Sequence, residues 1–154
     1  MRDDAWWKRW SGVPGWFNEA EGKTLYRLIY DLPTPAMIVE IGCFRGKSTI
    51  AMLQACADSS NDRHKLVISI DPFDGGDGAS SGLADERERA KLVKQFRDNV
   101  KSFNLDPWLS RLDVETSDEW FAQRDARGTS EYAAFFIDGL HSIVDQDMKR
   151  AWPL

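Results

Sequence analysis

The stretch MIVEIGCFRGKSTIAML (Met37–Leu53) contains an apolar run, a glycine-rich turn and a helical segment in direct succession. The run Met37–Ile41 is short and rich in β-branched residues, which is typical of a strand buried on both faces of a sheet. The following segment KSTIAMLQACA consists mainly of good helix formers. A strand that passes through such a loop into a helix is the first half of a βαβ unit.

The same order of strand and helix is predicted along the rest of the chain. Further strands are expected at Leu66–Ile70 and Ala133–Ile137, with a weaker one in LSRLDV. Helices are predicted after a cap at Asn18, with the apolar stripe Leu25, Leu28, Ile29 and Leu32, and at Asp85–Phe103, Asp118–Gln123 and Ile143–Trp152. This alternation indicates an α/β fold with a Rossmann-like, doubly wound parallel sheet and right-handed crossovers.

Composition narrows the class of protein further. The 154 residues fit a single domain (1–154), and 42% hydrophobic with 29% charged residues is ordinary for a globular chain. A net charge of −5 gives no basic excess for nucleic acid, and no apolar run is long enough to cross a membrane. Two cysteines without CxxC spacing and no signal peptide favour a reduced, cytoplasmic protein. The Trp-rich N-terminal segment 1–17 is expected to pack on the domain or on a partner.

The residues that follow the strands carry the candidate chemistry, because ligands of parallel sheets bind at the strands' carboxyl ends. Asp71 and Asp138 follow two of the strands, and the glycine-rich loop follows the first. An acid after the next strand suits the two hydroxyls of a ribose. Gly42–Ser48 reads GxxxGKS, one residue shorter than the phosphate-binding loop of NTPases. The segment AAFFID resembles the apolar strand and following acid that hold Mg²⁺ in those enzymes. A P-loop-like nucleotide-binding protein is therefore the weaker alternative.

Three segments in order, IVEIGCFRGKSTIAML, ISIDPFDG and FFIDGLHSIVDQDMKRAW, resemble a class I S-adenosylmethionine (SAM)-dependent methyltransferase. The resemblance is to the small-molecule O-methyltransferase-like group (methyltransferase family 24-like) with ExGxxxGxS and IDGxH motifs. It extends from about Val13 to Leu154. The implied activity is transfer of a methyl group from SAM to a hydroxyl of a small molecule, with a sugar or a natural product as acceptor.

The resemblance also implies site residues. The cofactor would be bound by Glu40, Gly42, Cys43, Gly46, Ser48, Asp71, Pro72 and Asp138. In this assignment Glu40 and Gly42 lie against the methionine part, Asp71 takes the ribose, and Pro72-Phe73 lies beside the adenine. The adenine-side acid is left open within Glu115–Asp118.

Asp138 and His141 match IDGxH and would be catalytic, beside the point where the methyl group leaves. In related enzymes an Asp near this place binds a divalent cation such as Mg²⁺, so Asp138 and Asp147 are candidate metal ligands. Purely structural roles are the alternative for these residues and for Asp71. Asp71 could cap a turn before Pro72, and His141 could make a structural hydrogen bond. Acids in the first turns of the last helix interact favourably with the helix dipole wherever they occur.

The four expected strands correspond to the first four of a seven-stranded family fold and would lie in the order 3-2-1-4. Strands 5–7 are then missing, and the chain is expected to be truncated at its C-terminus. The strand at Ala133–Ile137 would leave an open edge, through which a homo-oligomer could form. The alternative function is accordingly a catalytically incomplete SAM-binding fragment or interaction module.

Overall fold

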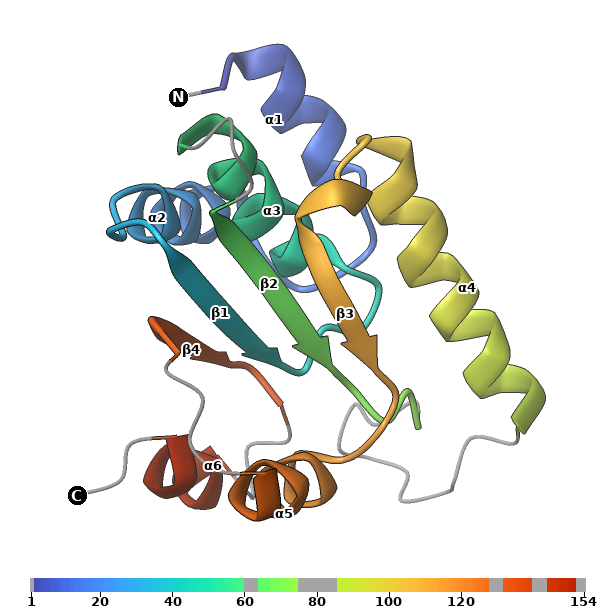
Figure 1. Cartoon of the computed structure of the whole chain (residues 1–154). Helices are drawn as coiled ribbons and strands as arrows, with labels where there is room; N and C mark the ends of the chain where they lie inside the picture. The colour runs from blue at the N-terminus through green and yellow to red at the C-terminus, as the bar shows by residue number, and fades with distance from the viewer. Residues whose placement is uncertain (1, 60–63, 75–85, 128–131, 140–143, 152–154) are drawn as a thin grey trace.

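A computed structural model describes residues 2–59, 64–74, 86–127, 132–139 and 144–151 (Figure 1). Its helices and strands alternate as the sequence predicts. The elements are α1 (Asp4–Ser11), α2 (Glu19–Tyr30), β1 (Ala36–Ile41), α3 (Lys47–Ser59), β2 (Lys65–Ile70), α4 (Glu86–Ser102), the short 3₁₀ helix η1 (Asp106–Trp108), β3 (Leu109–Asp113), α5 (Ser117–Arg127), β4 (Ala134–Ile137) and α6 (Val144–Ala151). None of the helices in this part of the chain is long and apolar enough to span a membrane.

The four strands form one parallel sheet in the order β3-β2-β1-β4, which confirms the expected order 3-2-1-4. β1 lies between β2 and β4, with Glu40 opposite Ser69 of β2 and Phe136 of β4. Because all strands run in the same direction, the loops after β1, β2 and β4 meet at one edge of the sheet, the edge formed by the carboxyl ends of the strands. Within the described residues, β4 has a neighbouring strand on one side only, so its other edge is open.

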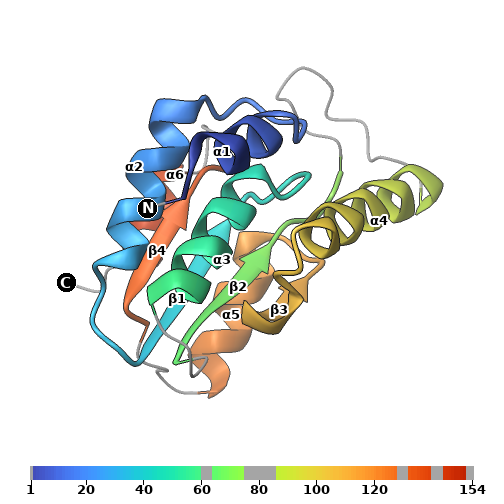
Figure 2. The same cartoon turned by 90° about the horizontal axis from the view of Figure 1, so that it is seen from above.

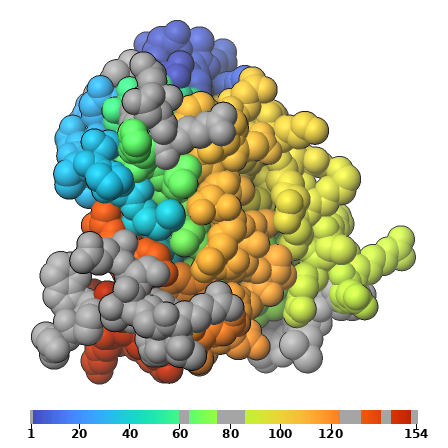
Figure 3. All heavy atoms as spheres, in the orientation of Figure 1, coloured from blue at the N-terminus to red at the C-terminus, as the bar shows by residue number. Residues whose placement is uncertain are grey.

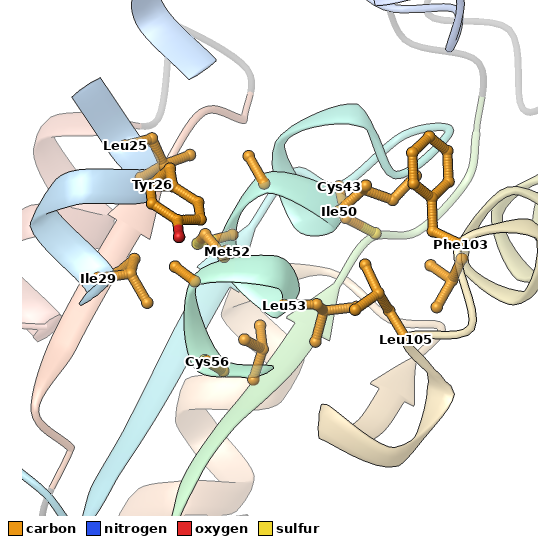
Figure 4. Packing of buried hydrophobic residues seen from close by; sticks show 14 of the residues in the cluster. Leu25, Tyr26, Ile29, Cys43, Ile50, Met52, Leu53, Cys56, Phe103 and Leu105 are labelled. Atoms are coloured by element: carbon orange, nitrogen blue, oxygen red, sulfur yellow. The ribbon is translucent and has the colours of Figure 1, made fainter. Parts of the chain in front are cut away.

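Successive side chains of each strand point to opposite faces of the sheet, and different helices cover the two faces (Figure 2). On one face, Ile38 and Val67 join the core that α1, α2, α3 and α4 complete. On the other face, Val39, Ile68 and Ile70 pack against Trp120 and Phe121 of α5. The fold is therefore a three-layer α/β/α arrangement, with α3 in the centre of its layer between α2 and the chain around Phe103 and Leu105 (Figure 4).

The N-terminal helix α1 is an element that the sequence pattern did not predict. Asp3 caps it by accepting from the backbone N–H of Trp6, and Trp7 and Trp10 are fully buried. α1 lies at the end of the molecule opposite α5 and α6 (Figure 3). The expectation that the Trp-rich segment packs on the domain is thus confirmed. It was missed as a helix because Trp and Asp have only modest helix propensity.

The buried face of α2 differs from the predicted stripe. Asn18 caps α2 with a complete capping box, as expected, but Leu28 is 63% exposed. Gly22, Leu25, Tyr26 and Ile29 form the buried face instead. The Trp10 ring lies on Gly22, which turns that side of the helix inward and leaves Leu28 in water.

Candidate functional site

The loop between β1 and α3 turns sharply, and its backbone requires glycine at two positions. Gly42 and Gly46 have φ values of 86° and 85°, in the left-handed region, and Phe44 between them has φ 44°. Gly42 also lies directly under the end of β4. A Cβ atom on Gly42 would come within 2.5 Å of the Asp138 carbonyl oxygen. The glycine therefore brings the predicted cofactor loop into contact with the predicted catalytic segment.

We expect Gly42→Ala to lower the free energy of unfolding by about 2 kcal/mol, because the side chain combines a strained φ with a collision against backbone. Gly139→Ala is the matched control, since its Cβ would meet Ile41 at an ordinary 3.6 Å. Urea unfolding of both variants is the measurement. Equal effects of the two substitutions would contradict the close approach at Gly42.

Asp71 joins the loops that follow β1 and β2. One carboxylate oxygen accepts from the backbone N–H of Phe44 and the other from that of Phe73, each at 2.7 Å. Burial raises the pKa of Asp71, and the backbone hydrogen bonds from Phe44 and Phe73 oppose that shift. Each oxygen keeps lone-pair capacity for a further donor. The residue is therefore both a turn-forming acid and an acceptor at the strand end, which combines the two roles considered from the sequence.

Glu40 is fully buried and faces α3 rather than open space. Its carboxylate accepts hydrogen bonds from the hydroxyls of Ser48 at 2.6 Å, Thr49 at 2.6 Å and Ser69 at 2.7 Å. Burial raises the pKa of Glu40 to about 7, although these three hydroxyls act in the opposite direction. Glu40 and Ser48 thus tie the first turn of α3 to β1 and β2. Their predicted contact with the methionine part of SAM stays a prediction.

The side chain of Lys47 points away from the loop that it follows. Its ammonium donates to the carbonyl oxygens of Ser11 at 3.3 Å and Gly15 at 3.5 Å. In a phosphate-binding loop the equivalent lysine reaches the phosphates and the next hydroxyl binds Mg²⁺. Here the lysine binds the α1 end of the chain and the Ser48 hydroxyl binds Glu40. This arrangement disfavours the P-loop-like alternative.

The remaining residues of the predicted cofactor site differ in their exposure. Cys43 is buried, and burial, followed by the charges of Asp71 and Glu40, raises the pKa of its thiol. It is therefore a protonated filler of the loop. Pro72 is half-buried, but Phe73 is buried against Phe96 of α4. The Phe73 ring therefore belongs to the core, and the expectation that Pro72-Phe73 lies beside the adenine stays a prediction.

Asp138 follows β4 at the same edge of the sheet, and its side chain is exposed. Its backbone N–H donates to the Ile41 carbonyl at 2.8 Å, which keeps the ends of β1 and β4 together. His141 lies outside the described residues. The structure therefore brings Gly42, Asp71 and Asp138 to one edge, as the positions after the strands predict.

Asp147 lies elsewhere, in α6, where it is buried and next to Ser117 at the start of α5. Burial raises the pKa of its carboxyl group. Among the described residues, no three His, Cys, Asp or Glu side chains are close enough to share a metal ion. The metal roles of Asp138 and Asp147 stay predictions from the sequence.

The segment left open for an adenine-side acid forms the start of α5. Thr116 caps this helix by donating to Glu119 and accepting from its N–H. Glu115 accepts from Gln123, and Asp118 accepts from Gln146 and Arg150 of α6. The two hydrogen bonds to Asp118 join α5 to α6, and none of these bonds selects among the candidates.

An aromatic connector between α1 and α2 completes this edge and was not predicted as part of the site. Trp16, which is 75% exposed, stacks on Phe44 with ring centroids 5.1 Å apart. Phe17 meets Phe136 of β4 edge-on at 5.7 Å. The connector therefore bridges the β1 loop and β4. Its aromatic residues were visible in the sequence, but their partners are distant in the chain and no local pattern identifies them.

Comparison with known families identifies the family to which most of the chain corresponds. The family described as "Methyltransferase domain" matches residues 39–154, which is most of the chain. The chain belongs to this methyltransferase family. The match begins at Val39, so it includes Glu40, the glycine loop, Asp71 and Asp138. A comparison with curated proteins finds no significant match.

Solved structures share the fold of this family member at low sequence identity. An O-methyltransferase from Bacillus cereus in complex with S-adenosylhomocysteine (SAH) has a TM-score of 0.64 and 19% identity, covering 98% of this chain and 61% of that one. TomG from Streptomyces achromogenes, an O-methyltransferase of tomaymycin synthesis in complex with SAM, has a TM-score of 0.64 and 16% identity. The match covers 98% of this chain and 60% of TomG. The SAH-bound methyltransferase PaMTH1 of Podospora anserina has a TM-score of 0.63 and 13% identity. The match covers 94% of this chain and 52% of PaMTH1. The chain thus spans about 60% or less of the length of these proteins.

Proposed function

We propose that this chain binds SAM at the edge formed by the loops after β1, β2 and β4, and that it serves methyl transfer to a hydroxyl group of a small molecule. The observation that carries the proposal is Asp71, which holds the glycine loop by the N–H of Phe44 and keeps acceptor capacity at the strand end. Membership of a methyltransferase family supports it. SAM supplies a methyl group on a positively charged sulfur.

The residues of the chain divide into those that bind and those that face the reaction. Asp71 accepts the ribose hydroxyls, and the sharp turn at Gly42 and Gly46 lets the cofactor approach the first turn of α3 closely. The Asp138 backbone lies beside Gly42, and in this proposal its exposed carboxylate favours the positive charge of the sulfonium. The catalytic role of His141 stays a prediction from the IDGxH motif.

The acceptor class rests on weaker support. The similar solved structures are named as O-methyltransferases, one of them in the synthesis of a natural product. A hydroxylated natural product or sugar is therefore the proposed acceptor. Homo-oligomer formation through β4, the cytoplasmic location and the C-terminal truncation likewise stay predictions.

The test of the proposal is a calorimetric titration of the chain with SAH, with Mg²⁺-ATP in parallel. We expect SAH to bind with a dissociation constant in the micromolar range, equivalent to about −8 kcal/mol, and ATP not to bind. Binding of ATP alone would overturn the assignment of the glycine loop to SAM. Absence of any binding would overturn the proposal that this chain holds the cofactor.

A second function is kept because the chain spans about 60% or less of the similar structures. It is a SAM-binding fragment or interaction module without turnover. SAH binding is common to both functions, so the distinguishing measurement is methyl transfer from labelled SAM to a panel of hydroxylated acceptors. Detected transfer by the chain alone would exclude the non-catalytic function.

A further inference from the structure

Two reciprocal contacts join the end of α1 to the start of α3. The indole N–H of Trp10 donates to the carbonyl oxygen of Lys47 at 2.8 Å. In return the Lys47 ammonium donates to the carbonyl oxygens of Ser11 and Gly15, and it lies 5.1 Å from the centroid of the Trp10 ring. The first residue of α3 is therefore bound to the N-terminal segment through both its backbone and its side chain.

The core determines where the indole of Trp10 lies. Trp10 is completely buried, and its ring rests on Gly22 of α2, where an added Cβ atom would come within 2.4 Å. The ring also packs edge-on against Trp7, with centroids 5.4 Å apart. A side chain that is held this closely cannot follow movements of the loop, so its N–H is a fixed donor for Lys47.

The segment that Trp10 holds is the one on which the proposed cofactor would rest. Lys47 directly follows Gly46, at the end of a loop whose backbone enters the left-handed region three times. On the sheet side, Glu40 holds the next two residues, Ser48 and Thr49, through their hydroxyls. On the other side, Trp10 holds Lys47. The first turn of α3 is thus fixed from two directions.

We propose that Trp10 is a positioning residue of the SAM site, which acts through Lys47 without touching the cofactor. The inference rests on the proposed function of the glycine loop. A correctly placed helix start presents its free N–H groups to a ligand, and displacement of that turn weakens binding. The N-terminal helix α1, which lies before the residues matched by the methyltransferase family, then belongs to the working cofactor site.

The chain contains a matched control for this role in the same helix. Trp7 is as buried as Trp10 and also packs on aromatic rings of the core. Its indole N–H, however, has no hydrogen-bond partner in the part of the chain that the structure describes. Trp7→Phe and Trp10→Phe remove the same volume from the same helix, and only Trp10→Phe also removes a bond to α3.

The experiment measures SAH affinity by calorimetry and thermal unfolding for wild type, Trp10→Phe and Trp7→Phe. We expect Trp10→Phe to raise the dissociation constant of SAH about five- to tenfold, an effect bounded by the free energy of the one buried hydrogen bond that is lost, and Trp7→Phe to change it less than twofold. Both should lower the unfolding temperature, Trp10→Phe more than Trp7→Phe, because only Trp10→Phe removes a hydrogen bond. Equal loss of affinity in both variants, or none in either, would overturn the inference.

A second readout separates this inference from the proposed function. In the ligand-free protein, we expect Trp10→Phe to speed amide hydrogen exchange of residues 47–50 more than Trp7→Phe does. If wild type does not bind SAH, the proposed function fails. Amide hydrogen exchange still tests whether Trp10 positions the first turn of α3, and equal exchange in the two variants would overturn that role. Should Trp10→Phe not fold, benzothienylalanine at position 10 keeps the ring shape and replaces the N–H by sulfur. Unchanged exchange and SAH affinity in that variant would also overturn the inference.

Discussion

Replacing Asp71 with alanine is expected to weaken SAH binding by at least about 100-fold. Two ribose hydroxyls donating to one charged carboxylate contribute about 1.5–3 kcal/mol each, and tenfold in affinity corresponds to about 1.4 kcal/mol. The substitution also removes the acceptor for the backbone N–H groups of Phe44 and Phe73, so the glycine loop loses its link to the end of β2. Both effects lower the affinity for SAH. Calorimetric titration with SAH measures the change.

Two further variants separate these contributions. Asp71→Asn keeps one side-chain oxygen and the size of the residue, and we expect an intermediate loss of affinity. Asp145→Ala removes one negative charge from an exposed position in α6 and controls for net charge. An affinity of Asp71→Ala within threefold of wild type, with SAH binding to wild type established, would contradict the ribose assignment. A large loss in Asp145→Ala would show that net charge, rather than Asp71, determines the affinity.

Replacing Glu40 with alanine is expected to lower the free energy of unfolding by about 3–5 kcal/mol. Three buried hydroxyls, of Ser48, Thr49 and Ser69, lose their acceptor, and each unsatisfied buried donor costs about 1–3 kcal/mol. The alanine also leaves a cavity between β1 and α3. Part of this loss is offset, because the carboxylate is costly to bury, as its raised pKa indicates. Urea unfolding measures the change in stability, and a loss below about 1 kcal/mol would contradict the role of Glu40 as the common acceptor.

The pH dependence of unfolding provides the control for Glu40. Its pKa is about 7 in the folded chain against an ordinary value of 4.5, so the folded state binds the proton more tightly than the unfolded state. The resulting stabilisation is complete below about pH 4.5 and is lost as the pH rises through 7. Glu40→Gln cannot titrate. Relative to this variant, wild type should therefore lose stability between pH 5 and pH 8, and parallel curves would contradict the raised pKa.

The sequence by itself determined the order of the strands, of the helices from α2 onward, and the positions of the strand-end residues. Short β-branched runs, the glycine loop and the cap at Asn18 are local signals, because propensity and turn chemistry depend on near neighbours. Once the strands are parallel, residues such as Asp71 and Asp138 must meet at one edge. The strand order 3-2-1-4 depended on the resemblance to the methyltransferase family, since propensity does not specify which strands pair.

Only the tertiary structure decided what the side chains contact. The motif assigned Glu40 to the methionine part of SAM, but its three donors come from α3 and from Ser69, which is 29 residues away. Gly42 is required by the Asp138 carbonyl, and the exposure of Leu28 follows from the Trp10 ring on Gly22. The bond from Trp10 to Lys47 spans 37 residues. Such contacts are set by how the elements pack across the sheet, and the periodicity of one segment contains no information about its distant partners.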